Sequence, residues 1–127
     1  MFGGSDAGIF GIHTEARTTL LLAALPPGLD GVGDLEMLDG RLLATAYTGG
    51  TSPIDPPDVL LEVDATGAGA RVVGSIGFTC VWALVALDGR LWGIDCAERL
   101  LSIDPATGAG TVVRSVGFMG WGATARR

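Results

Sequence analysis

The pentapeptide Leu87-Asp88-Gly89-Arg90-Leu91 is the clearest indication of the fold, because the same five residues also stand at Leu38-Asp39-Gly40-Arg41-Leu42. In each copy an Asp-Gly pair separates two apolar runs. This pair is typical of a two-residue type I′ turn, in which both central residues need a positive φ. Each copy therefore predicts a β-hairpin.

Two further segments repeat along the chain. Val63-Asp64-Ala65-Thr66-Gly67-Ala68-Gly69 returns one residue longer as Ile103-Asp104-Pro105-Ala106-Thr107-Gly108-Ala109-Gly110, and residues 72–78 return 40 residues later as residues 112–118. A period near 40 with short strands is typical of β-propeller blades, each of which is a four-stranded antiparallel sheet. A repeat that builds such a scaffold does not by itself carry chemistry.

Short apolar runs separated by Asp-Gly, Thr-Gly and Pro-Gly signals predict an all-β chain without long helices. The predicted strands lie near residues 9–13, 18–25, 32–38, 41–47, 59–64, 70–76, 81–87, 90–95, 99–104, 111–116 and 119–125. In the turns that begin at Asp64 and Asp104, we expect the carboxylate to accept a backbone N–H two residues further on.

The repeats predict one half-propeller domain of three blades. Blade one comprises residues 1–25 plus 117–127, blade two residues 29–76, and blade three residues 77–116. The N-terminal part matches only the last three strands of a blade, starting with Met1-Phe2-Gly3 in the place of Leu91-Trp92-Gly93. The C-terminal part matches an innermost strand, with Trp121 in the place of Trp82.

Three blades do not close a ring, since closed propellers have four to eight blades. We therefore expect two copies to join head to tail as a homodimer with six blades. Strand exchange at the termini would pair the C-terminal strand of one copy with the N-terminal segment of the other. This pairing also covers an edge strand that would otherwise promote aggregation.

The net charge of −6 is carried without any lysine, and the eight arginines are scattered. An acidic chain without a basic stripe is a poor binder of nucleic acid, so we expect no such partner. The longest apolar runs are too short to span a bilayer, and the N-terminal residues have no positively charged segment followed by an apolar one. We expect no membrane partner and a cytoplasmic location.

Ser102-Ile103-Asp104-Pro105-Ala106-Thr107-Gly108 and Asp88-Gly89-Arg90-Leu91-Trp92-Gly93 resemble the repeats of bacterial β-propeller proteins of the quinoprotein-like and YncE-like groups. The resemblance is strong over residues 60–122 and weak over residues 1–30. It implies the propeller fold and no particular activity, because such proteins include binding modules and enzymes. The chain differs from them in having only three repeats, and no residues match a quinone-cofactor site.

No catalytic constellation is evident in the sequence. His13, the only histidine, stands where the other repeats have Asp64 and Asp104, so we expect it to cap a turn. Four aspartates offer oxygen ligands to Ca²⁺: Asp30, Asp34, Asp55 and Asp58. Their spacing is not that of an EF-hand, and a solvated acidic loop is the preferred interpretation. We expect no enzymatic activity, no cofactor and no metal.

Trp82, Trp121, Asp34 and Glu36 are the candidate ligand-binding residues. The two tryptophans open innermost strands and so would lie at the mouth of the central channel, where an indole can stack on a sugar or another flat ligand. Packing between adjacent blades explains the same two positions without a ligand. Asp34 and Glu36 lie in another innermost strand, where they would line a hydrated channel or face a cation or polar ligand.

Cys80 and Cys96 flank the hairpin around Asp88-Gly89, which places them one register step apart. A disulfide between them is one interpretation. The preferred interpretation is that both cysteines are small buried apolar residues.

We interpret the chain as a non-catalytic scaffold or binding module. One alternative is lectin-like binding of a glycan or small molecule at the channel mouth. A second is a propeller hydrolase, which would need converging metal ligands. A third is a fragment or engineered piece of a longer propeller.

Overall fold

The computed structural model describes residues 1–48 and 55–125, and the regular structure of this part of the chain is entirely β-strand. Sheet I contains β1 (Phe2–Gly4), β2 (Gly8–His13) and β3 (Thr18–Ala24). Sheet II contains β4 (Gly31–Leu38), β5 (Arg41–Tyr47), β6 (Val59–Asp64) and β7 (Gly69–Ser75). Sheet III contains β8 (Ala83–Leu87), β9 (Arg90–Ile94), β10 (Arg99–Ile103) and β11 (Gly110–Ser115).

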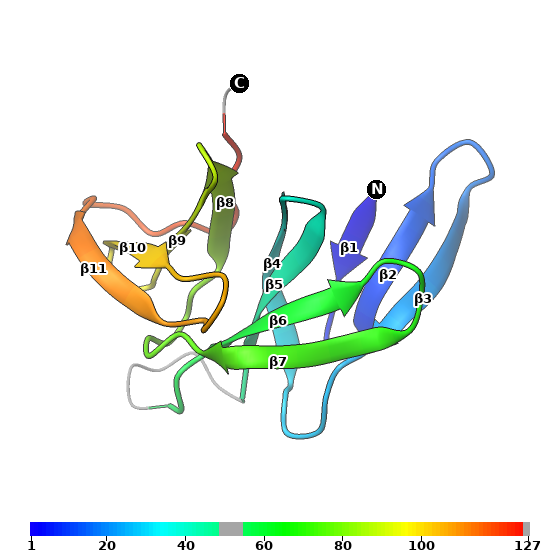
Figure 1. Ribbon diagram of the computed structural model, residues 1–127, viewed down its shortest axis with the longest axis horizontal. Coiled ribbons are helices and arrows are strands. Elements are labelled where there is room, and N and C mark those ends of the chain that lie inside the picture. Colours follow the sequence, from blue (N-terminus) through cyan, green and yellow to red (C-terminus); the bar gives the residue numbers. More distant parts are fainter. Residues whose placement is uncertain (49–54, 126–127) are drawn as a thin grey trace.

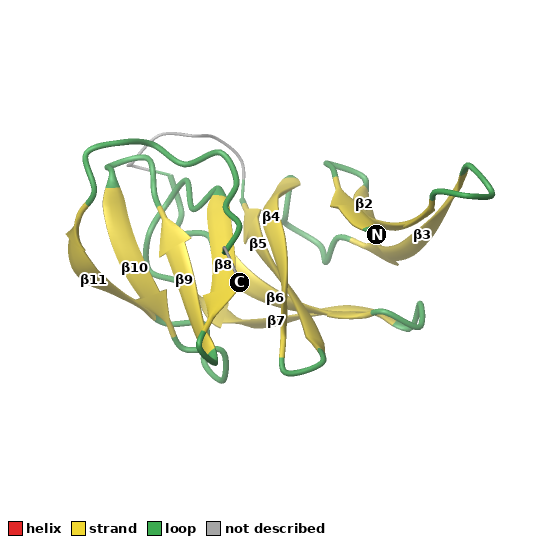
Figure 2. Ribbon diagram, turned by 90° about the horizontal axis from the view of Figure 1, so that it is seen from above, coloured by secondary structure: helices red, strands yellow, loops and turns green. Residues whose placement is uncertain are grey.

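Each sheet is an antiparallel meander in which neighbouring strands follow one another in the chain. The three sheets lie side by side in chain order, with sheet II between the other two (Figures 1 and 2). Strand β4 of sheet II contacts both β8 of sheet III and β1 of sheet I. The all-β class predicted from the sequence is therefore confirmed.

The two Asp-Gly hairpins form as predicted. Leu87 pairs with Arg90, and Asp88 and Gly89 between them have φ values of 53° and 70°. The corresponding Asp39 and Gly40 have φ values of 49° and 77°. A positive φ at both central residues is the requirement of a type I′ turn, which explains the choice of Asp and Gly.

The turns that close the last hairpin of each sheet are also capped as predicted. Asp64 Oδ1 accepts the N–H of Thr66 at 2.8 Å, and Asp104 Oδ1 accepts the N–H of Ala106 at 2.8 Å. His13 takes the same part in sheet I, where its Nδ1 accepts the N–H of Ala16 at 3.3 Å. The single histidine is thus a turn residue.

A bulge at the same place in all three sheets shows which strands correspond. The register between the last two strands shifts after Ile9 in sheet I, after Leu60 in sheet II and after Leu100 in sheet III. Strands β2 and β3 therefore correspond to β6 and β7 and to β10 and β11. Since β1 then corresponds to β5 and β9, no strand among residues 1–48 and 55–125 takes the place of β4 and β8 in sheet I.

Two apolar clusters hold the sheets together. Between sheets I and II, the buried side chains include Ile9, Ala44 and Leu61. Between sheets II and III, they include Leu43, Leu60 and Leu101, among others. Both faces of sheet II are thus covered, whereas sheets I and III each bury one face against it.

Two predicted strands differ from the structure. The strand predicted over residues 81–87 begins only at Ala83, because Cys80 has a φ of 56° and the Val81 N–H donates to Asp58 Oδ2 instead of to a strand. The strand predicted over residues 119–125 is wrong for the single chain, where this segment is irregular. A strand forms only with a partner strand, and the edge of β1 that would pair with this segment is not beside it in the strand order.

Candidate functional site

The indoles of Trp82 and Trp121 meet although 38 residues of chain lie between them. Their ring centroids are 4.5 Å apart and their planes are inclined by 22°, which is a stacked arrangement. Trp82 lies just before β8 and is half-buried, whereas Trp121 is 70% exposed. The pair therefore presents one accessible indole face on a second indole that is held by the fold.

The Asp34 carboxylate on β4 binds the backbone two residues after each tryptophan. Its Oδ2 accepts the N–H of Leu84 at 2.8 Å and the N–H of Ala123 at 3.1 Å, while its Oδ1 accepts the N–H of Leu35 at 2.9 Å. Burial raises the pKa of Asp34, and these three hydrogen bonds lower it in part. The carboxylate thus connects sheets II and III and the C-terminal segment.

Glu36 lies two residues further along β4 and does not join the cluster. Its Oε1 accepts the N–H of the adjacent Met37 at 2.9 Å. Its negative charge makes a minor contribution to the raised pKa of Asp34. Of the four candidate residues, the structure therefore brings together Trp82, Trp121 and Asp34, and leaves Glu36 beside them.

Glycines let the backbone come close at this site. A Cβ on Gly33 would lie 2.8 Å from the carbonyl oxygen of Val81, so β4 can approach the residues before β8 only without a side chain. A Cβ on Gly120 would lie 2.8 Å from the Cβ of Ala83. The C-terminal segment consequently packs directly against the first strand of sheet III.

Asp58 is a buried residue whose role the sequence did not reveal. It is 2% exposed, and its carboxylate accepts backbone N–H groups from Val81, at 2.7 Å, and from Cys80. Burial raises its pKa to about 6 in spite of these bonds. The interpretation of Asp58 as part of a solvated acidic loop is wrong, because this carboxylate closes the strained turn before sheet III.

Asp95 is a second buried carboxylate with a structural role. Its Oδ1 accepts the N–H groups of Ala97 and Arg99, and its Oδ2 pairs with the Arg99 guanidinium at 2.6 Å. The Arg99 guanidinium also lies 4.8 Å from the centre of the Phe78 ring. The only hint in the sequence was the position of Asp95 at the end of a predicted strand.

Cys80 and Cys96 come close but are not joined by a disulfide. The Cys96 Sγ lies 3.9 Å from the carbonyl oxygen of Thr79, and Cys80 is buried. Burial, and next the neighbouring Cys96 thiol, raise the pKa of Cys80 to about 12. In this structure Cys80 and Cys96 are therefore two thiols and not a disulfide.

Among residues 1–48 and 55–125, no group of three or more His, Cys, Asp and Glu side chains is arranged to hold a metal ion. In the same residues, no helix has the length and apolar character needed to cross a membrane. No protein-family model matches the chain, and the comparison with curated proteins found no match. The resemblance to bacterial propeller repeats therefore depends on the repeated motifs alone.

Proposed function

We propose that the chain is a non-catalytic β-propeller scaffold or binding module that pairs with a second copy to form a six-bladed ring. Each sheet would be one blade, and blade one would be completed by the C-terminal segment of the partner. The observation that carries the proposal is that sheet I, within the described residues, has only three strands, together with the segment 119–125, in which Trp121 stands in the place of Trp82 just before β8.

The uneven burial of corresponding residues supports this assembly. Leu60 on sheet II is fully buried, whereas its counterpart on sheet III, Leu100, is partly exposed. Leu61 and Leu101 are fully buried, whereas their counterpart on sheet I, Phe10, is partly exposed. The two outer faces therefore carry residues of the kind that fill the two inner interfaces, and covering them would be favourable.

Exposed apolar residues also collect where the new strand would pair. Met1 and Phe2 of β1 are exposed, as are Phe118, Met119 and Trp121 of the C-terminal segment. The pairing of β8 with β9 sets the expected register, since Val85 lies opposite Trp92 and Leu84 opposite Gly93. Transferred to the partner, this register places Thr124 opposite Phe2 and Ala123 opposite Gly3 of the other copy.

A charge on an outer face tests the proposal. We expect Leu100→Glu to convert a dimer into a folded monomer, because Leu100 would lie in the new interface. Val72→Glu is the matched control, since Val72 is 46% exposed on sheet II and lies outside both outer faces. Light scattering after size-exclusion chromatography, with circular dichroism to verify folding, gives the result. A Leu100→Glu variant that remains as dimeric as the control would refute the ring.

Lectin-like binding at the channel mouth is the second candidate, and the exposed face of Trp121 beside Asp34 favours it. A glycan array followed by calorimetry would test it, with Trp121→Ala as the binding-deficient variant. Trp92→Ala is the control, because Trp92 lies on β9 and is not a member of the stacked pair. Absence of any glycan hit, or equal binding by both variants, would contradict this candidate.

A further inference from the structure

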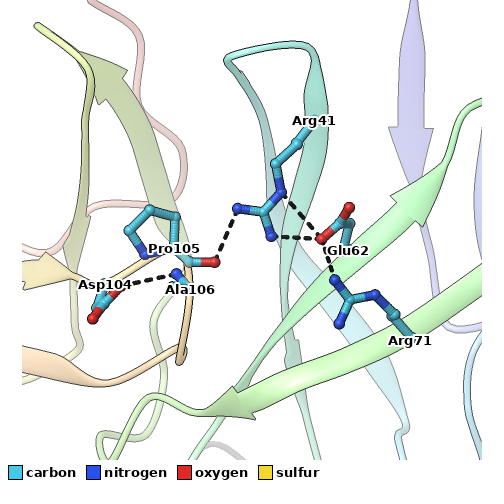
Figure 3. Close-up of polar contacts among 6 residues, drawn as sticks. All are labelled: Arg41, Glu62, Arg71, Asp104, Pro105 and Ala106. Carbon is cyan, nitrogen blue, oxygen red and sulfur yellow. Dashed lines mark hydrogen bonds and ion pairs between the residues drawn. The ribbon is translucent and has the colours of Figure 1, made fainter.

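Sheets II and III are connected by an arginine that reaches from one sheet to a turn of the next. The Arg41 guanidinium at the start of β5 donates to the carbonyl oxygen of Pro105, in the turn between β10 and β11, at 3.1 Å (Figure 3). Glu62 orients this guanidinium through a 2.5 Å ion pair and also pairs with Arg71 at 2.7 Å. The contact lies beside a cavity of about 520 Å³ on sheet II.

Each sheet carries a cavity at this same place. On sheet II the cavity is bordered by Arg41 and Asp64, and on sheet III a cavity of about 290 Å³ is bordered by their counterparts Arg90 and Asp104. On sheet I a cavity of about 290 Å³ is bordered by His13, the counterpart of Asp64.

On two of the three sheets, a turn of the following sheet lies beside this cavity. The cavity on sheet I is also lined by Ala65, which belongs to the turn between β6 and β7 of sheet II. At sheet II the neighbouring turn supplies the Pro105 carbonyl oxygen. The cavity on sheet III is lined, within the described part of the chain, by residues of sheet III and its own turns alone.

Arg90 corresponds to Arg41, but within the described residues no turn of another sheet lines its cavity. Arg90 is exposed, and within residues 1–48 and 55–125 it has no ion-pair partner. Ser102 is the counterpart of Glu62 on sheet III. Glu62 pairs with Leu43, two residues after Arg41, and Ser102 pairs with Trp92, two residues after Arg90. Sheet III therefore offers Arg90 no carboxylate at the position that Glu62 has beside Arg41.

We propose that the Arg90 cavity is the docking site for the turn between β2 and β3 of a second copy of this chain. This inference rests on the proposed ring, in which sheet I of the partner follows sheet III. Thr14 corresponds to Pro105, since His13 corresponds to Asp104, so the Thr14 carbonyl oxygen of the second copy accepts from Arg90. The exposed Glu15 beside it supplies the opposite charge.

Cross-linking between two singly substituted chains tests the site. Thr14→Cys and Arg90→Cys chains are mixed, allowed to exchange subunits and treated with a short bismaleimide, and the linked peptides are identified by mass spectrometry. We expect a covalent dimer that joins the two introduced cysteines. Thr14→Cys mixed with Arg41→Cys is the matched control, because the place beside Arg41 is filled by the chain's own turn.

The possible outcomes distinguish a wrong docking site from a wrong ring. If the mixture is dimeric by light scattering but Thr14→Cys links to Arg90→Cys no better than to Arg41→Cys, the docking site is wrong and the ring stands. If the wild-type chain is monomeric at the same concentration, both proposals fall. As a second variant, Arg90→Glu should raise the dissociation constant of the dimer about tenfold or more, whereas Arg71→Glu should leave it unchanged; equal constants for the two variants would overturn the site.

Discussion

The Asp34 carboxylate on β4 accepts the backbone N–H of Ala123 at 3.1 Å, although the two residues are 89 positions apart. The same oxygen accepts the N–H of Leu84 at 2.8 Å. A single side chain thus holds the C-terminal segment against the first strands of sheets II and III. It keeps the segment next to sheet III, where the first strand of a following blade would begin.

Replacing Asp34 by alanine should release the C-terminal segment. Three partly buried N–H groups, those of Leu35, Leu84 and Ala123, lose their acceptor, which costs about 1–3 kcal/mol in the free energy of unfolding. The stack of Trp121 on Trp82 should weaken at the same time, with a loss of near-ultraviolet circular dichroism. Glu36→Ala is the control and should change neither signal, because the Glu36 carboxylate accepts the N–H of its neighbour Met37 and, within the described residues, none from the C-terminal segment. Equal behaviour of the two variants would argue against this role of Asp34.

Gly74 on β7 should not tolerate a side chain. A Cβ there would collide with the backbone carbonyl of Thr107 in the turn of sheet III, and backbone cannot move aside as a flexible side chain does. We expect Gly74→Ala to destabilise the fold by about 1–3 kcal/mol. At Gly11 the added Cβ would lie 3.5 Å from Leu22, an ordinary contact, so Gly11→Ala serves as the control. Urea unfolding measures both, and a stability of Gly74→Ala as high as that of Gly11→Ala would show that the two sheets do not pack this closely.

Local features of this fold were predictable, because a local pattern encodes them. The Asp88-Gly89 pair specifies its own φ values, and the periodic apolar runs specify which residues pair across the strands. The role of Asp58 was not predictable, since its partners Cys80 and Val81 lie more than 20 residues away. For the two tryptophans we predicted equivalent positions in two repeats, but not that their rings stack on each other.

Asp58 should make stability depend on pH between about 4 and 6. Burial raises its pKa to about 6, against about 3.9 in an unfolded chain. In this window the folded protein holds a proton that the unfolded chain has lost, so the contribution of Asp58 to stability falls as the pH rises. A shift of about two units corresponds to about 3 kcal/mol.

Asp58→Asn isolates this contribution, because asparagine does not titrate and all other groups are unchanged. The free energy of unfolding of the wild type minus that of the variant should decrease from pH 4 to pH 6.5. Chemical denaturation at several pH values measures it. A difference that is constant over this range would show that Asp58 titrates normally.

The two cysteines should react at different rates in the folded protein. The pKa of Cys80 is raised to about 12, so at pH 8 its buried thiol is protonated and unreactive, whereas Cys96 is only half-buried. Iodoacetamide at pH 8 should alkylate Cys96 first, and Cys80 only after unfolding. Mass spectrometry of the peptides shows the order, and faster labelling of Cys80 would contradict its burial.

A native mass spectrum of the wild type shows directly whether a second copy is present to supply the first strand of sheet I. We expect a species at twice the 12.9 kDa of one chain at micromolar concentration, dissociating when Leu100 is replaced by glutamate. A wild-type spectrum that contains only the folded 12.9 kDa monomer would contradict it.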